Sequence, residues 1–259
     1  MDLGLKDRVI VVTGGAKGIG AAIVRACARE GGLPVIVDQD ESAVLEIQET
    51  LTTEDGKSEA IIVDLTDFSR SCSAIRDVGR KLGRIDALVN NAGTNDGVSL
   101  EHGTPAQFAA SLERNLVHYY AVAHTALPFL KDSKGSITNI ASKVAVTGQG
   151  GTSGYAAAKG AILALTFEWA AELSQFGIRV NAVLPAEVMT PQYQSWLQRF
   201  KDPQKELEKI ESRIPLGHRL TNPDEIAAAV VFLLSPNSTI TGQEVFVDGG
   251  YVHLDRSLV

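Results

Sequence analysis

A tyrosine and a lysine, Tyr155 and Lys159, stand four residues apart in a segment with helical periodicity. Helical spacing stacks the two side chains on one face, about one turn from each other. Before desolvation offsets it, a lysine cation about 4 Å from a phenol favours the phenolate by about 4 kcal/mol at an effective dielectric of about 20, which lowers the pKa of the tyrosine. The pair therefore predicts a general base that takes a proton from an alcohol, although a packed tyrosine beside a solvated lysine gives the same spacing.

A glycine-rich turn follows the first apolar run and leads directly into a helical segment. Gly14, Gly18 and Gly20 give the spacing G-x-x-x-G-x-G, which differs from the commoner G-x-G-x-x-G of dinucleotide sites. Glycines let the backbone turn sharply and approach a ligand closely, and the free N–H groups at a helix start attract anions. The turn, with Lys17 and Ile19 inside it, is expected to bind a pyrophosphate, although glycines also end strands and let helices pack tightly on sheets.

An acidic residue, Asp38, ends the second apolar run, eighteen positions beyond Gly20. A carboxylate there would accept hydrogen bonds from the adenosine ribose hydroxyls and would repel a 2′-phosphate. Lys17 has the opposite charge and could contact a 2′-phosphate, or it could be a solvated turn residue. NAD is therefore the expected cofactor, with NADP as the alternative that Lys17 allows.

In their order and spacing these residues resemble the compact members of the short-chain dehydrogenase/reductase family, over nearly the whole chain. The segments that carry the resemblance are Thr13 to Gly20, Asp38, Asp64-Leu65, Asn90 to Gly93, Asn115, Ser142, Tyr155-x-x-x-Lys159, Pro185 with Thr190-Pro191, and Val247 to Gly250.

The resemblance implies a role for each of four catalytic residues. Tyr155 would be the general acid and base, and Lys159 would lower its pKa and hold the nicotinamide ribose. Ser142 would orient the substrate oxygen; a serine that caps the following turn is the other interpretation of this residue. Asn115 would fix a water that links Lys159 to solvent.

The same resemblance implies a set of cofactor contacts, with Asp64 at the adenine and the loop from Pro185 beside the nicotinamide. That loop reads Pro185-Ala186-Glu187 where many family members have Pro-Gly, and because alanine lacks the freedom of glycine at positive φ, a different loop path is expected. The expected cofactor-binding residues are Gly14, Lys17, Gly18, Ile19, Gly20, Asp38, Asp64, Leu65, Asn91, Ala92, Gly93, Tyr155, Lys159, Pro185, Val188 and Thr190.

Polar residues gather on the loops expected around the reacting carbon, with Trp196 nearby. An unpaired buried polar group costs about 1 to 3 kcal/mol, so such a pocket suits a hydroxylated molecule, and an aromatic ring would cover its apolar face. Solvated loop residues would look the same. The candidate substrate residues are Asn95, Ser142, Gln149, Tyr155, Glu187 and Trp196.

Three segments, Ala141 to Ala158, Leu184 to Pro191 and Gly250 to Arg256, resemble the bacterial L-fucose dehydrogenases of this family. That resemblance implies oxidation of the anomeric hydroxyl of L-fucose or a related aldose to the lactone. The alternatives are a ketone, acyl or hydroxysteroid reductase on the same scaffold, and a dinucleotide-binding sensor without catalysis. Asp38 and the polar loops disfavour the first, and the reactive residues at all four catalytic positions disfavour the second.

Strand-like and helical segments alternate along the chain, which predicts an α/β fold: a doubly wound, mostly parallel seven-stranded sheet with helices on both faces, in one domain over residues 1–259. Residues 190–214 interrupt the alternation and are expected to form a small helical lid over the substrate. The strand-like runs are Val9 to Val12, Val35 to Val37, Ala60 to Val63, Ala87 to Val89, Ile137 to Ile140, Ile178 to Leu184 and Val245 to Val247. The helical stretches include Ile19 to Arg29, Phe68 to Leu82, Leu112 to Leu130 and Tyr155 to Phe176.

Composition narrows the range of partners. The net charge of -7, with no run of Lys or Arg, argues against nucleic acid. No lipid-spanning run or cleavable leader is visible, which predicts a cytoplasmic protein without membrane contact, and Cys27 and Cys72 lack the spacing of metal ligands. The expected partners are a small-molecule substrate, expected to be a sugar, and further copies of the chain in a homo-tetramer, which a tail containing Tyr251, His253, Asp255 and Arg256 could reach.

Overall fold

The structure, a computed structural model, describes residues 2–254. Within that range seven parallel strands form one sheet in the order β3-β2-β1-β4-β5-β6-β7, which confirms the doubly wound fold. The strands are β1 (Val9–Thr13), β2 (Leu33–Asp38), β3 (Glu59–Ile62), β4 (Ala87–Asn90), β5 (Ser136–Ile140), β6 (Arg179–Pro185) and β7 (Glu244–Val247).

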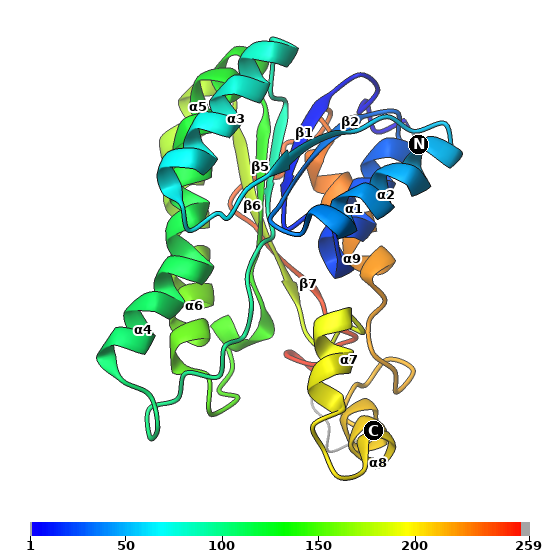
Figure 1. The fold of residues 1–259 in the computed structure, drawn as a ribbon, viewed down its shortest axis with the longest axis vertical. Helices are drawn as coiled ribbons and strands as arrows, with labels where there is room; N and C mark the ends of the chain where they lie inside the picture. Colours follow the sequence, from blue (N-terminus) through cyan, green and yellow to red (C-terminus); the bar gives the residue numbers. More distant parts are fainter. Residues whose placement is uncertain (1, 255–259) are drawn as a thin grey trace.

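The sheet is covered on both faces (Figure 1). Helices α1 (Gly18–Arg29), α2 (Glu41–Thr53) and α9 (Pro223–Leu234) pack on one face, and α3 (Phe68–Leu82), α5 (His118–Ser133) and α6 (Ser153–Leu173) pack on the other. Strand β1 shows why its first four residues are all apolar. Val9 and Val11 belong to the core beneath α3, α5 and α6, whereas Ile10 and Val12 belong to the core beneath α1, α2 and α9. Because side chains alternate along a strand, both sets are buried.

The expected helix over Leu112 to Leu130 is wrong at its start. Helix α4 (Pro105–Leu112) ends there, a π-helical turn covers Glu113–Val117, and α5 follows at His118. A π-helical turn inserts one residue into the helical repeat and is common at functional sites. The helix expected over Tyr155 to Phe176 begins close to its predicted position. Helix α6 runs over Ser153–Leu173 and continues as a 3-10 turn over Ser174–Phe176.

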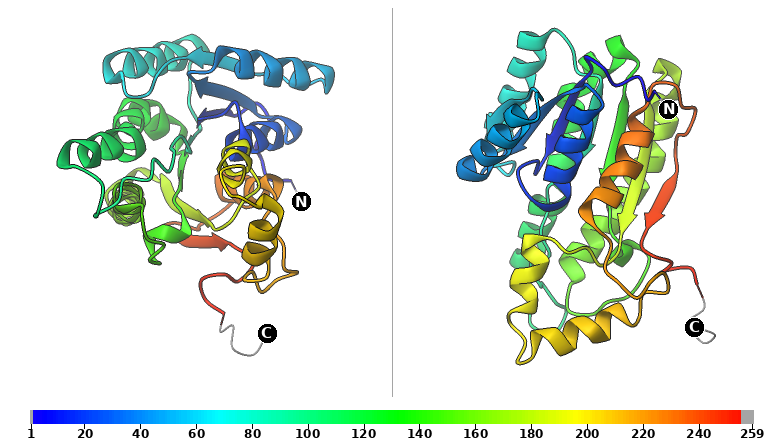
Figure 2. Two further views of the ribbon diagram at one scale, coloured as in Figure 1. Left: turned by 60° about the horizontal axis from the view of Figure 1, so that its bottom comes forward. Right: turned by 90° about the vertical axis from the view of Figure 1, so that its right-hand side faces the viewer.

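The segment expected to be a lid forms two short helices, α7 (Pro191–Leu197) and α8 (Pro203–Glu211). Each begins with a capping side chain followed by proline: Thr190 accepts a hydrogen bond from Tyr193 N at 3.2 Å, and Asp202 accepts one from Lys205 N at 3.1 Å. Figure 2 shows both helices beyond the carboxyl ends of β6 and β7. This is the edge of a parallel sheet at which ligands of such folds bind.

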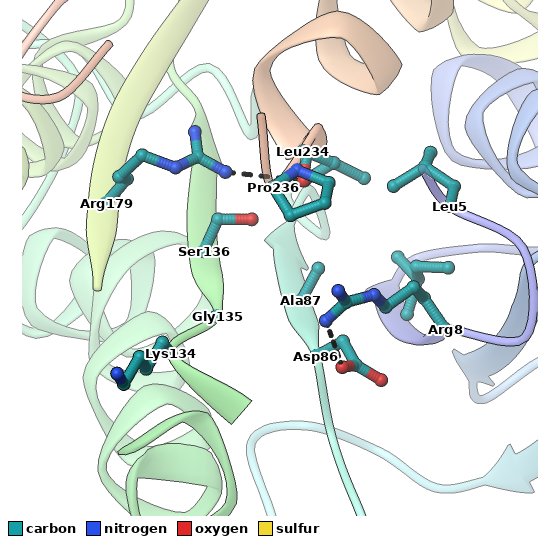
Figure 3. Close-up of a pocket in the computed structure, with 11 residues that line it drawn as sticks. Leu5, Arg8, Asp86, Ala87, Lys134, Gly135, Ser136, Arg179, Leu234 and Pro236 are labelled. Carbon is teal, nitrogen blue, oxygen red and sulfur yellow. Dashed lines mark hydrogen bonds and ion pairs between the residues drawn. The ribbon is translucent and has the colours of Figure 1, made fainter. Parts of the chain in front are cut away.

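At the opposite edge of the sheet, the described residues enclose a small cavity (Figure 3). Its volume is about 10 Å³, room for one water at most. Arg8 donates to Asp86 at 2.8 Å beside it, and Arg179 donates to the carbonyl oxygens of Leu233 and Ser235 at 2.6 and 2.8 Å, which caps the end of α9. These contacts stabilise the fold at this edge of the sheet. A functional site is therefore expected at the carboxyl edge.

None of the helices between residues 2 and 254 has both the length and the apolar character needed to cross a lipid bilayer.

Candidate active site

The predicted site residues follow the carboxyl ends of neighbouring strands. Gly14 follows β1, Asn91 follows β4, Ser142 lies two residues beyond β5, and Glu187 lies two residues beyond β6. Strand β1 lies between β2 and β4, so the crossovers leave this point of the sheet in opposite directions. A doubly wound sheet opens into a crevice there, and dinucleotides bind in it.

The glycine turn depends on the absence of side chains. Gly14 and Gly18 have φ values of 60° and 53°, and a Cβ on Gly20 would lie 1.9 Å from the Gly14 carbonyl oxygen. The amide of Asn91 donates to the carbonyl oxygens of Thr13 and Gly14 at 2.9 and 3.1 Å. Asn91 therefore fixes the shape of the turn through its side chain, a function that the sequence did not suggest.

This turn fits the pyrophosphate of a dinucleotide. No described side chain caps the start of α1, so its first backbone N–H groups meet no side-chain acceptor. At the end of β2 the Asp38 carboxylate accepts hydrogen bonds from Ala16 N and Asp40 N, both at 3.1 Å. Lys17 is paired with Asp40, and this contact raises the pKa of Lys17. The positive charge of Lys17 is thus already paired with a carboxylate of the protein.

Two further cofactor candidates pack against the protein itself. Asp64 accepts hydrogen bonds from the N–H and the hydroxyl of Thr66, both at 2.8 Å, and these bonds lower the pKa of Asp64. Leu65 is buried in the core. Both residues follow β3, on the side of the crevice expected for the adenine.

Tyr155 and Lys159 lie on α6, and the Lys159 nitrogen is 5.5 Å from the centre of the Tyr155 ring. Burial raises the pKa of Tyr155 to about 12, and the nearby hydroxyl of Ser142 acts in the opposite direction. Burial also lowers the pKa of Lys159 to about 7. The expectation that the lysine charge lowers the pKa of the tyrosine is therefore wrong for this structure.

The physical reason is the position of the lysine. Its ammonium group donates to the carbonyl oxygen of Ile140 at 2.7 Å and to the hydroxyl of Tyr119 at 3.1 Å, so it is held away from the phenol. Surrounding protein atoms disfavour both the cation and the phenolate. In this structure desolvation exceeds the attraction between the two groups.

Asn115 lies in the π-helical turn beside this pair. Its side-chain oxygen accepts a hydrogen bond from Thr94 N at 2.7 Å, and its amide donates to Ser111 O at 3.0 Å. A Cβ on Gly93 would lie 3.0 Å from that oxygen and 3.7 Å from the Lys159 nitrogen, so the three residues meet. Both ends of the Asn115 side chain are therefore bonded to protein groups.

Two buried residues of the site were not predicted. Tyr119 donates to Ile140 O at 3.0 Å and accepts from Lys159, and neither nitrogen of the His118 ring has a hydrogen-bond partner among the described residues. Burial lowers the pKa of His118 to about 4, and the charge of Lys159 adds to the effect. Both residues follow Asn115 by one helical turn, and that spacing is the signal that could have identified them.

The candidate substrate residues fall into two groups. Glu187 forms an ion pair with Lys143, the residue after Ser142, and Trp196 lies on α7. Asn95 and Gln149 are exposed on loops, and Asn95 accepts a hydrogen bond from Gly97 N at 3.2 Å in its own turn.

Within residues 190–214, Trp196 belongs to an aromatic stack. Its ring lies 5.2 Å from the ring of Tyr193 and 4.8 Å from the ring of Phe200, centre to centre. Trp196 keeps 37% of its surface exposed. An aromatic face of this kind is available to a ligand at the carboxyl edge of the sheet.

The loop from Pro185 to Thr190 leads from the sheet to α7. Among the described non-glycine residues, positive φ occurs at Asp7, Asp55, Lys134 and His218, so Ala186 replaces the usual glycine without backbone strain.

The start of α7 reaches across the crevice. A Cβ on Gly18 would lie 3.2 Å from the Thr190 methyl carbon, and the Gln192 amide donates to the hydroxyl of Thr94, on the loop after β4. Val188 is buried and pairs with Thr221, which ties the loop to the segment before α9. The lid segment thus touches both the glycine turn and the β4 loop.

Known proteins of the same architecture cover almost the whole chain. A family model named adh_short_C2, described as enoyl-(acyl carrier protein) reductase, matches residues 14–252. An L-fucose dehydrogenase of Rattus norvegicus is 38% identical over 244 residues, which cover 94% of this chain and 88% of the relative. The crystal structure of Cj0485 dehydrogenase superposes with a TM-score of 0.94 at 46% identity, covering 99% of this chain and 98% of that one. The aldohexose dehydrogenase of Thermoplasma acidophilum superposes with a TM-score of 0.88 at 28% identity, covering 99% and 98%.

The fold and its dinucleotide cradle define an oxidoreductase of the class that depends on NAD(P). The chain belongs to the short-chain dehydrogenase/reductase family.

Proposed function

We propose that this enzyme oxidises the anomeric hydroxyl of L-fucose or a related aldose to the lactone, with NAD⁺ as the hydride acceptor. The observation that carries the proposal is the convergence of Ser142 and Tyr155 at the carboxyl edge of the sheet, close enough for the serine hydroxyl to act on the phenol, with Lys159 beside them. Two hydroxyl groups this close together are well placed to receive a third one, that of the substrate. Similarity to sugar dehydrogenases supports an aldose as that substrate.

In the proposed mechanism the reacting hydroxyl binds to Ser142 and Tyr155, which align it. The dinucleotide supplies the hydride acceptor when it is bound. The Tyr155 oxygen takes the hydroxyl proton as the phenol proton leaves it. Lys159, whose pKa near 7 allows it to exist as a neutral amine, receives that phenol proton through a bridging water, because its nitrogen is held away from the phenol. Ile140 and Tyr119 hold the resulting ammonium group by two hydrogen bonds.

The preference for NAD over NADP is supported by the end of β2. Asp38 and Asp40 place two carboxylates there, and Lys17 is already paired with Asp40. A 2′-phosphate bound there would be repelled by these carboxylates. Lys17 would not offset the repulsion, because its charge is already paired with Asp40.

Several surface features support the other parts of the proposal. Residues 190–214 would act as the lid, since α7 touches both sides of the crevice.

Tyr120 on α5 and Phe167 on α6 are 55% and 48% exposed, and large apolar side chains of this kind suit contact with further copies in a tetramer. In the tail, the His253 ring packs on Phe246 at 4.4 Å, whereas Asp255 and Arg256 lie outside the described residues.

A panel of aldoses and simple secondary alcohols, each assayed with NAD and NADP, tests the substrate and the cofactor together. We expect L-fucose and aldoses of the same ring configuration to have the highest kcat/KM, with NAD. Turnover of a steroid or an acyl substrate without activity on any sugar would refute the sugar assignment and favour the reductase alternative, which the description of the matching family model suggests. Mass measurement in solution tests the tetramer.

A further inference from the structure

A buried ion pair stands directly beside the catalytic serine. Lys143 follows Ser142 in the chain, and its ammonium group contacts the carboxylate of Glu187. The two side chains keep only 7% and 17% of their surface exposed. Buried charges of this kind are costly unless they are paired, and replacing such a pair by well-packed apolar residues often leaves stability unchanged or raises it. The pair joins the loop after β5 to the loop after β6, next to the reacting hydroxyl of the proposed function.

Aromatic side chains complete the surroundings of the pair. The Lys143 nitrogen lies 4.1 Å above the centre of the Tyr251 ring, which belongs to the C-terminal tail. From the lid, the Tyr193 hydroxyl is buried and makes no hydrogen bond of ordinary geometry within residues 2–254, yet Glu187 is close enough to help burial raise the pKa of Tyr193. Glu206 on α8 acts on Tyr193 in the same direction.

The charge balance of this cluster favours neutral ligands. The ammonium group of Lys143 has three donors and the Glu187 carboxylate has several acceptor sites, so the pair can bind hydroxyl groups while it carries no net charge. Glu206 adds negative charge on the lid side. A ligand with a carboxylate would therefore have to compete with Glu187 for Lys143, and it would face repulsion from both acidic side chains.

We infer that Lys143 and Glu187 form a charge filter that selects neutral sugars and rejects sugar acids of the same configuration. The inference rests on the proposed function, because it concerns the substrate of the same site. According to this inference, the pair determines specificity in two ways. Both side chains bind substrate hydroxyl groups, and Glu187 neutralises the charge of Lys143.

The test uses substrates that differ at a single carbon. L-Fucose, L-galactose and L-galacturonate share one ring configuration and carry a methyl, a hydroxymethyl and a carboxylate group at the sixth carbon. The measured quantity is kcat/KM for L-galacturonate divided by kcat/KM for L-galactose. We expect Glu187→Gln to raise this ratio by about tenfold or more, because Lys143 becomes free to pair with the substrate carboxylate.

The reciprocal variant makes the test independent of general damage to the site. Lys143→Met leaves Glu187 alone and is expected to lower the ratio, whereas Glu187→Asp keeps the charge and should keep the ratio. Glu208→Gln removes a carboxylate from an exposed position of α8 and serves as the matched control, with an unchanged ratio. If the pair were purely structural, either variant would lower kcat/KM for both substrates by the same factor, and that outcome would overturn the inference.

A binding measurement separates this inference from the proposed function. If the native enzyme oxidises no aldose, the proposed function is wrong, and the filter is then measured by calorimetric titration of the NADH-loaded protein with L-galacturonate. Tighter binding by Glu187→Gln than by the native enzyme supports the filter. Equal binding by the two proteins would refute it.

Discussion

The ammonium nitrogen of Lys159 lies 3.1 Å from the hydroxyl oxygen of Tyr119, a residue of the neighbouring helix α5. Tyr119 in turn donates to the carbonyl oxygen of Ile140, which also accepts from Lys159. The three groups form a closed triangle of hydrogen bonds beneath the tyrosine of the site. This triangle fixes the lysine from below, independently of Tyr155.

Removal of the Tyr119 hydroxyl tests the positioning role of this residue. Tyr119→Phe deletes an acceptor of the Lys159 ammonium group, which costs about 1 kcal/mol and favours the neutral amine. We expect a lower apparent pKa for oxidation and a fall in kcat of about fivefold, with little change in KM. Tyr120→Phe, at an exposed neighbouring position, is the control. A pH profile identical to that of the native enzyme would show that Tyr119 only fills space.

The pH dependence of oxidation follows from the direction of the lysine shift. Because burial disfavours the cation, the pKa of Lys159 is lowered to about 7, and the amine that accepts a proton forms above that pH. We expect kcat/KM for oxidation to rise about tenfold per pH unit below this value and to level off above it. In the direction of reduction the dependence is reversed.

Two variants check the assignment of this limb of the profile. Lys159→Met should move the rising limb toward the pKa of Tyr155, which burial raises to about 12. Tyr155→Phe should lower kcat by about 10² to 10⁴ while the protein still binds NADH. Retention of the limb near neutral pH in Lys159→Met would assign it to another group.

The carboxylate at the end of β2 is expected to control cofactor choice. Asp38→Asn keeps an acceptor for Ala16 N and removes the negative charge, so it should raise kcat/KM with NADP relative to NAD by about tenfold. Asp67→Asn serves as the control, since Asp67 caps α3 away from the glycine turn. An unchanged ratio in Asp38→Asn would mean that another group excludes the 2′-phosphate.

The glycine turn allows a test of dinucleotide binding with a well-matched control. In Gly20→Ala the new Cβ would lie 1.9 Å from the Gly14 carbonyl oxygen, so α1 and the turn have to separate. We expect the Kd for NADH to rise by at least about tenfold, since the N–H groups no longer converge on one anion. Gly148→Ala places its Cβ where no described atom lies within 4 Å and should bind NADH as the native protein does. Equal affinities in the two variants would contradict the assignment of the turn.

The sequence predicted those parts of the molecule that depend on local pattern. The apolar run Val9 to Val12 and the glycines after it indicated a buried strand followed by a sharp turn, and both are present. The π-helical turn around Asn115 was missed because one inserted residue hardly alters a helical hydrophobic pattern. The direction of the tyrosine and lysine shifts was missed because spacing alone does not show how deeply the two side chains are buried.

Contacts between distant segments were also beyond the sequence. Lys143 and Glu187 are 44 residues apart, and they meet because β5 and β6 are neighbours in the sheet. Gln192 and Thr94 are 98 residues apart, and they meet because α7 crosses the crevice. Each pair requires knowledge of strand order and loop path, neither of which periodicity supplies.

The bond between Gln192 and Thr94 has a kinetic consequence. Thr190, two residues before Gln192, lies against Gly18, so this segment has to move away before a dinucleotide can enter, and a substrate bound beneath it would hinder that movement. Turnover should then follow a compulsory order, with NAD⁺ entering first and NADH leaving last. Product inhibition by NADH would accordingly be competitive toward NAD⁺ alone, and weakening the bond in Gln192→Ala would relax that order toward random entry.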